Sequence, residues 1–272
     1  HRQTLFPYTT LFRSIVNHSS VAPRFGNGNG GSVPSTSGLT FTNRASAGNA
    51  RIGNTDGGIT LFAGNSTAGN AIIVSNGGTA LFSGALFTGM STAGNAHITS
   101  NTSGIAQFNA GASAGSATLV NNGGDISSFS ITSFVNALLN PATVAPSAND
   151  VGITAFIGPG ATAATSSITN NSGGVTAFLL DSTAGSATIV TNSGGATFFT
   201  GTSSGGTARL VVNAGGTLDL AAHDLGIVQA GSLAQATGSV HRIGVSPTQS
   251  SALVLGGTAT LQGAVLQVVP AA

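Results

Sequence analysis

The chain has 272 residues, of which 41 are Gly, none is Cys or Trp, and only 5% are charged. The absence of Cys excludes a disulfide framework, and a hydrophobic share of 40% does not fit the polar, highly charged composition of disordered chains. The formal net charge is +1, and no uninterrupted apolar run approaches the ~20 residues that a membrane-spanning helix needs.

The first residues differ from everything that follows them. Residues 4–14 read TLFPYTTLFRS, which resembles the translation of a sequencing-library adapter, and we exclude residues 1–14 from the fold on that ground. Without Arg2 and Arg13, five Arg face six Asp, so the positive net charge does not indicate a nucleic-acid partner. We expect residues 15–37 to be a disordered or irregular N-terminal fragment.

Residues 38–237 carry a repeat of about 21 residues. Its most regular mark is a Gly followed four positions later by a large apolar residue, and in one unit the spacing is five. The marks are Gly58 and Phe62, Gly78 and Phe82, Gly104 and Phe108, Gly124 and Phe129, Gly152 and Phe156, Gly174 and Phe178, Gly195 and Phe199, Gly216 and Leu220, and, beyond this range, Gly257 and Leu261. One such unit cannot bury its own apolar face, whereas stacked copies share a continuous core.

Each unit contains two strand patterns and two kinds of corner. Residues 50–52 and 187–189 alternate small or apolar residues with variable ones, which is the period of a strand with one buried face. A polar turn such as residues 192–195 follows, and a second strand such as residues 196–199 ends on the marker Phe. Ala-Gly-Asn or Ala-Gly-Ser corners close the unit, because Gly and Asn accept positive φ at little cost.

Every copy repeats the same order of short strands without a helical period, so neighbouring copies should pair in parallel. The predicted fold class is all-β: a single-stranded parallel β-helix, or β-solenoid, with rungs of about 21 residues. About ten or eleven rungs at ~4.8 Å each would build a rod of roughly 50 Å. Inward-facing Phe, Ile, Leu and Ala should supply most of its stability.

Irregular spacing between the marker phenylalanines predicts two inserts, at residues 85–90 and 131–150. Inserts on one face of a solenoid are the usual place for binding surfaces. The longer insert offers an exposed apolar set as a partner-binding site: Phe134, Val135, Leu138 and Leu139. The alternative is a loop folded over the side of the solenoid.

From residue 238 the repeat changes into short strands linked by Gly and Pro. The strand Val240 to Val245, the Ser246-Pro247 turn and the strands that follow resemble the C-terminal segment of autotransporter passengers, the exported parts of type V secretion proteins. The AGNA and NSGG corners resemble such passengers too, so the resemblance covers roughly residues 38–269. His241 and Ser251 stand where relatives often have an aromatic residue and an Asp.

This resemblance implies a cap and folding nucleus at residues 238–269, with residues 270–272 starting a linker. An outer-membrane β-barrel translocator should then follow, which makes the chain a fragment of a longer protein. The implied location is the cell surface or the extracellular space, with the full-length protein anchored in the outer membrane.

The acidic residues decide whether an enzyme is expected. Carbohydrate-active β-helices need paired carboxylates or an acidic calcium site, but the aspartates are scattered singly: Asp56, Asp125, Asp150, Asp181, Asp219 and Asp224. Only Asp219 and Asp224 lie near each other in sequence, beside His223, and the histidines lack metal-ligand spacing. We therefore predict no catalytic, cofactor or metal site.

The sequence thus favours a structural or adhesion-type rod that is displayed on a cell surface. Host or bacterial surface molecules are the expected partners besides the barrel, and nucleic acid is not. Two alternatives remain at this stage: a β-helical enzyme acting on polysaccharides, in which Asp219 and Asp224 would be essential, and a filamentous adhesin or phage-type fibre.

Overall fold

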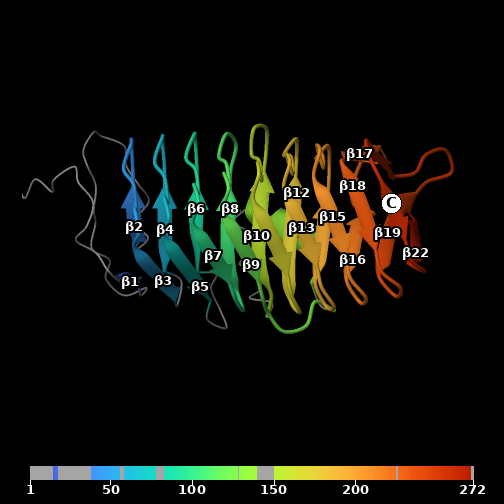
Figure 1. The fold of residues 1–272 in the computed structure, drawn as a ribbon, viewed down its shortest axis with the longest axis horizontal. Coiled ribbons are helices and arrows are strands. Elements are labelled where there is room, and N and C mark those ends of the chain that lie inside the picture. The colour runs from blue at the N-terminus through green and yellow to red at the C-terminus, as the bar shows by residue number, and fades with distance from the viewer. Residues whose placement is uncertain are drawn as a thin grey trace, which may run out of the picture.

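The computed structural model describes residues 15–17, 38–55, 58–77, 83–127, 129–139, 150–224 and 226–270. They form an all-β parallel β-solenoid of about 9 turns, with roughly 22 residues per turn. Figure 1 shows the strands side by side along the long axis, coloured from blue to red in chain order, so the chain advances along the rod without doubling back. The predicted fold class is confirmed.

Two ten-stranded parallel sheets form two sides of the solenoid. Sheet A contains β1 (Ile15–Asn17), β3 (Arg51–Thr55), β5 (Ile72–Asn76), β7 (His97–Ser100), β9 (Thr118–Asn121), β11 (Ser167–Asn170), β13 (Thr188–Thr191), β15 (Arg209–Val212), β18 (Ser232–Gln235) and β21 (Ala259–Leu261). Sheet B contains β2 (Gly38–Phe41), β4 (Ile59–Phe62), β6 (Ser83–Phe87), β8 (Gly104–Phe108), β10 (Gly152–Ile157), β12 (Gly174–Leu179), β14 (Ala196–Phe199), β16 (Thr217–Leu220), β19 (Val240–Val245) and β22 (Val265–Pro270).

The third side is narrower and is built from single parallel bridges. One Ser or Thr from each turn pairs with its counterpart in the next, from Ser46 to Ser204. Each hydroxyl also accepts the backbone N–H two residues later, as Thr92 Oγ1 does from Gly94 at 3.0 Å. Gly94 has φ 62°, and a Cβ there would lie 2.8 Å from the Gly69 carbonyl oxygen, so any other residue would be strained at this position. At the C-terminal end, β17 (Ile227–Ala230) and β20 (Ala252–Leu255) pair in parallel as a separate sheet.

A stack of aromatic rings runs through the core. Sheet B directs into it one Phe per turn, with adjacent ring centroids 4.6 to 4.9 Å apart and ring planes within 12° of parallel: Phe41, Phe62, Phe87, Phe108, Phe156, Phe178 and Phe199. Sheet A supplies a parallel column of Ile and Leu, from Ile52 to Leu233, all buried. The interior beside Ile189, Leu210 and Leu218 leaves no volume that a water molecule could enter.

The inner corner between the two sheets is polar and fully buried. Asn121 Nδ2 donates to Asn170 Oδ1 at 2.8 Å along the rod, and Thr154 Oγ1 donates to Asn121 Oδ1 at 2.8 Å across the corner. Thr176 Oγ1 repeats the cross-corner bond to Asn170 Oδ1 at 2.8 Å. Buried amides are tolerated when they are hydrogen-bonded, so Asn121 and Asn170 are satisfied within the corner. Ser100 Oγ, in the same column, is buried without a hydrogen-bond partner in the structure.

Three sequence predictions about register are wrong. The inward Phe of the third turn is Phe87 and not Phe82, because Ser83–Phe87 forms β6 and pairs in register with β4 and β8. Residues 85–90 are therefore no insert, and the surplus falls before β6, in a stretch where residues 78–82 lie outside the described part. Phe129 faces the outside of sheet B, and Leu261 belongs to sheet A. Counting Phe129 as a rung marker added a turn that does not exist, because Phe108 pairs directly with Phe156.

The N-terminal segment also differs from expectation. Residues 15–17 were expected to be irregular, yet they form β1 and pair with β3 in sheet A; residues 1–14 and 18–37 lie outside the described part. The segment after residue 238 continues both sheets, because β21 pairs with β18 and β22 pairs with β19. Its changed sequence therefore does not mark a change of fold.

Candidate functional site

The predicted partner-binding insert folds back onto the solenoid. Residues Ile131–Leu139 form helix α1, and Phe134 is only 5% exposed. Phe134 packs with Phe129, at a ring-centroid distance of 5.8 Å, over outward residues of β10, β12 and β14. Val135 is partly buried in the same cluster.

The prediction of an exposed apolar site is therefore wrong for Phe134, whereas Val135 is only partly buried. The alternative, a segment folded over the side of the solenoid, is what these residues show. The side chains of Leu138 and Leu139 lie outside the described part. The sequence carried a signal for this outcome. Apolar residues at 131, 134, 135 and 138 follow the spacing of an amphipathic helix, which buries its apolar face. Residues 140–149 of the same predicted insert also lie outside the described part.

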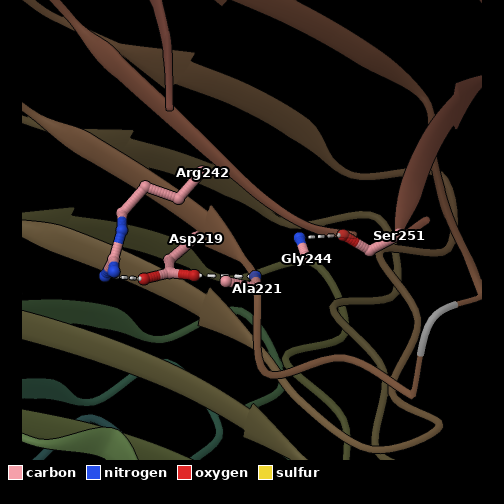
Figure 2. A network of polar contacts seen from close by, with 5 residues as sticks. All are labelled: Asp219, Ala221, Arg242, Gly244 and Ser251. Carbon is pink, nitrogen blue, oxygen red and sulfur yellow. Dashed lines mark hydrogen bonds and ion pairs between the residues drawn. The ribbon is translucent and has the colours of Figure 1, made fainter. Parts of the chain in front are cut away.

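The aspartates with the strongest claim to chemistry are held apart from each other. Asp219 lies on the outer face of β16, where it is 3% exposed, and its Oδ2 accepts from Arg242 Nη1 at 2.5 Å. Its other oxygen, Oδ1, accepts from the Ala221 N–H at 2.8 Å (Figure 2). Asp224 is exposed and lies after β16, near the third side of the solenoid. Its backbone N–H donates to the Gly201 carbonyl. The two carboxylates do not form a pair.

Strand register explains the contact between Asp219 and Arg242. The parallel pairing of β16 with β19 places these residues side by side, 23 positions apart in sequence. Burial raises the pKa of Asp219 above its ordinary value, opposed by the Ala221 N–H and by Arg242. This ion pair could not be predicted from the sequence, because it depends on the register between β16 and β19.

His241 occupies an inward position of β19 that is Leu in the turns before and after it, Leu218 and Leu266. Its Nδ1 lies 3.2 Å from Gln235 Oε1, and desolvation lowers its pKa below the ordinary 6.5. Its Nε2 is buried and has no hydrogen-bond partner in the structure. His223 is also buried, with Nε2 3.1 Å from the Ser203 carbonyl. These histidines belong to the packing of the C-terminal turns.

Among the described residues, no three His, Cys, Asp or Glu side chains gather as they would around a metal ion. Within the same residues, no helix has the length and apolar character to cross a membrane. What the solenoid does offer is surface, and its faces differ in kind.

The outer face of sheet A is broad and regular. One outward column, read along the rod from β3 to β15, consists of Arg51, Ile72, His97, Thr118, Ser167, Thr188 and Arg209. The two arginines and the histidine are exposed. No carboxylate of the described residues stands in an outward column of this sheet.

Ladders of polar side chains run along the rod at both ends of the sheet A strands. After the strands, Asn76, Asn101, Asn122, Asn171, Asn192 and Asn213 join side chain to side chain at 2.7 to 2.9 Å. Before the strands, Asn49, Asn70 and Asn95 form a looser ladder at 3.3 Å. The same edge continues with hydroxyls, as in Ser116 and Thr165 at 3.0 Å.

A scan against models of known protein families finds no match, and a search of the curated proteins finds no similar sequence. The fold and the chemistry of its surfaces are therefore the basis for assigning a function.

Proposed function

We propose that this chain is part of an autotransporter passenger: a surface-displayed, structural or adhesion-type β-solenoid without catalytic activity. The observation that carries the proposal is the continuity of the rod. Both sheets run without a break from the repeats into the segment after residue 238, whose strands β19 to β22 resemble the end of such passengers. A single stack of this kind suits an extended stalk better than a substrate cleft.

The inventory of reactive groups supports the non-catalytic part of the proposal. Asp219, the most buried carboxylate described, is engaged by Arg242 and by a backbone N–H. A general acid or nucleophile needs a free face toward a substrate, and an ion-paired side chain on an outer sheet face does not supply one.

Surface display of the full chain tests the proposal. The 272-residue chain would be fused upstream of an autotransporter barrel in a Gram-negative host, and external protease would then be added to intact cells. We expect the chain to reach the surface as a protease-resistant rod and to increase cell aggregation or attachment. Retention in the periplasm by a correctly inserted barrel would contradict the passenger assignment.

A second arm tests the absence of catalysis. The purified chain would be incubated with a panel of polysaccharides, and new sugar ends would be measured. Turnover that Asp219→Asn or Asp224→Asn abolishes would replace the structural assignment with that of an enzyme.

A further inference from the structure

The charges of the solenoid are segregated by face. Of the five arginines outside residues 1–14, Arg51 and Arg209 lie in the exposed outer column of sheet A described above, together with His97. We call the outer surface of sheet A from β3 to β15 the basic face. Arg242, by contrast, lies on sheet B and is paired with Asp219.

The described carboxylates stand elsewhere. Asp125 and Asp150 belong to the segment around α1, Asp181 follows β12, Asp219 faces outward from β16 and Asp224 lies toward the third side. Asp56 lies outside the described residues. Among the described residues, neither Arg51 nor Arg209 has an ion-pair partner, so both guanidinium groups are free to meet an external anion.

The geometry of the basic face sets the shape of its ligand. Arg51, His97 and Arg209 stand on strands 1, 3 and 7 of the series β3, β5, β7, β9, β11, β13 and β15. At ~4.8 Å per strand, the column spans roughly 29 Å in a straight line parallel to the rod. Hydroxyls of Thr118, Ser167 and Thr188 fill the interval between His97 and Arg209, and Ile72 stands between Arg51 and His97. A matching ligand is extended and carries repeated, widely spaced acidic groups.

Two features favour a polysaccharide over a nucleic acid. The face has two arginines and one histidine over ~29 Å, whereas duplex DNA carries a charge every ~1.7 Å and is bound through many phosphate contacts. Single-stranded nucleic acid is usually held by stacked aromatic side chains, and no aromatic ring other than the His97 imidazole stands in the outward columns of β3 to β15. Hydroxyls and bordering carboxamide ladders instead suit the hydroxyl groups of sugars.

We propose that the basic face binds an acidic polysaccharide that lies along the rod, with Arg51 and Arg209 contacting its acidic groups and the intervening hydroxyls contacting its sugar rings. This inference deepens the proposed adhesive function by naming the class of ligand. It does not depend on export, so a purified chain can test it alone.

Biolayer interferometry with immobilised polymers is the test. Polygalacturonate presents carboxylates, dextran sulfate presents sulfates, and dextran is the uncharged reference. We expect the full chain to bind at least one acidic polymer, to leave dextran unbound, and to weaken as salt rises, because exposed charges are screened. Preference between the two acidic polymers identifies which acidic group is recognised.

Variants in the outward column distinguish binding at this site from a non-specific attraction of the polymer to positive charge. Arg51→Gln with Arg209→Gln should weaken binding by about tenfold or more, since two charge-assisted contacts are lost. Arg44→Gln, which removes an exposed charge in the turn after β2, should change it less than about twofold. Thr118→Lys with Thr188→Lys adds two cations to the same column and should strengthen binding.

Several results would overturn the proposal. They are a double Arg variant that binds as well as the parent chain, no binding to either acidic polymer at low salt, or equal binding to dextran. Tighter binding to duplex DNA than to both acidic polymers would replace the polysaccharide with a nucleic acid. Melting curves of each variant confirm that the exposed substitutions leave the rod folded. A failure to bind acidic polysaccharide would not contradict surface display, which tests the proposed function separately.

Discussion

Two regions of the same rod are built differently. In the central turns, residues 104–199, stacked Phe rings fill the core, the Asn ladder fills the inner corner, and α1 covers the outside of sheet B. In the C-terminal turns, residues 217–270, Leu220, Ile243 and Val268 continue the Phe column. A buried Asp, an inward His and exposed apolar residues appear there as well.

Exposure differs between the stacked turns and β22, because β22 is the last strand of sheet B and has a paired strand on one side only. Phe199 and Leu220 are fully buried, whereas Val268 in the same column is 57% exposed and Leu266 on the same strand is 61% exposed. Yet β22 keeps six consecutive parallel pairs with β19. Parallel pairing together with an inward apolar row is therefore enough to continue the coil.

The largest contrast is expected from truncating inward residues of the two regions. Phe108→Ala removes a fully buried ring stacked between Phe87 and Phe156, and we expect a loss of about 3–5 kcal/mol in the free energy of unfolding. Leu266→Ala changes a residue that is mostly exposed, so the expected loss is below about 1 kcal/mol. Urea denaturation followed by circular dichroism measures both.

Similar losses for the two variants would contradict the idea that the Phe stack holds the centre more firmly than the C-terminal turns. A change in the m-value, the slope of the unfolding free energy against urea concentration, would indicate that the two regions unfold separately, which stacked repeats permit.

The second contrast compares buried and outer amides of adjacent positions. Asn121→Ala leaves the Thr154 hydroxyl without its acceptor inside the corner and removes one of the two donors to Asn170 Oδ1, at a cost of roughly 1–3 kcal/mol for a buried group left unpaired. Asn122→Ala breaks the outer ladder at Asn101 and Asn171, where water replaces the lost bonds, and should cost about 1 kcal/mol or less.

The same denaturation assay ranks these two variants. Strand β15 supplies a natural comparison, because Val212 replaces the polar residue of the corner column between Thr191 and Gln235. If Asn121→Ala proved as mild as Asn122→Ala, the buried ladder would have no special role in the centre.

The sequence predicted the repeat well and its exceptions poorly, for a physical reason. Strand periodicity and Gly-rich corners are local signals, so the alternation of Arg51 with buried neighbours and the corner at Gly94 could be read directly. Register is not local: Phe82 and Phe87 are equally apolar, and only pairing with β4 and β8 decides that Phe87 points inward.

The same limit applies to the surfaces. An exposed Phe134 was one of two predictions for the insert, because inserts are the usual place for binding surfaces. The structure follows the other one, since Phe134 covers the apolar outward faces of β10, β12 and β14. The Asp219 and Arg242 contact and the single-column alignment of Arg51 with Arg209 likewise depend on strand order across many turns. Helical spacing in the insert was the one available local clue.

The third contrast is pH dependence, which should come from the C-terminal turns. The folded chain lowers the pKa of His241 through desolvation, so its neutral form is favoured in the fold. The associated stability is complete above the ordinary pKa of 6.5 and is lost as the pH falls below it. One such group contributes a slope of at most about 1.4 kcal/mol per pH unit.

His241→Leu, which restores the residue type of the adjacent turns, should remove that acid sensitivity and raise the melting temperature at pH 5. Asp219 acts in the opposite sense and at lower pH. Burial raises its pKa above 3.8, so its contribution falls as the pH rises through that region, and Asp219→Asn should flatten only this part of the profile. An unchanged profile for His241→Leu between pH 5 and 7 would refute the assignment.

The smallest effect concerns a corner where a central turn departs from the repeat. Ala164 has φ 51°, while the equivalent corners carry Gly, including Gly115 and Gly185, both at φ 61°. A left-handed backbone costs an Ala about 1–2 kcal/mol, and Gly gives back part of that gain through its freer unfolded chain. Ala164→Gly should therefore stabilise the rod by about 0.5–1 kcal/mol, whereas Ala163→Gly, at a buried neighbour without positive φ, should destabilise it. A loss of stability in Ala164→Gly would mean that the corner gains more from the Ala methyl group than it loses in backbone strain.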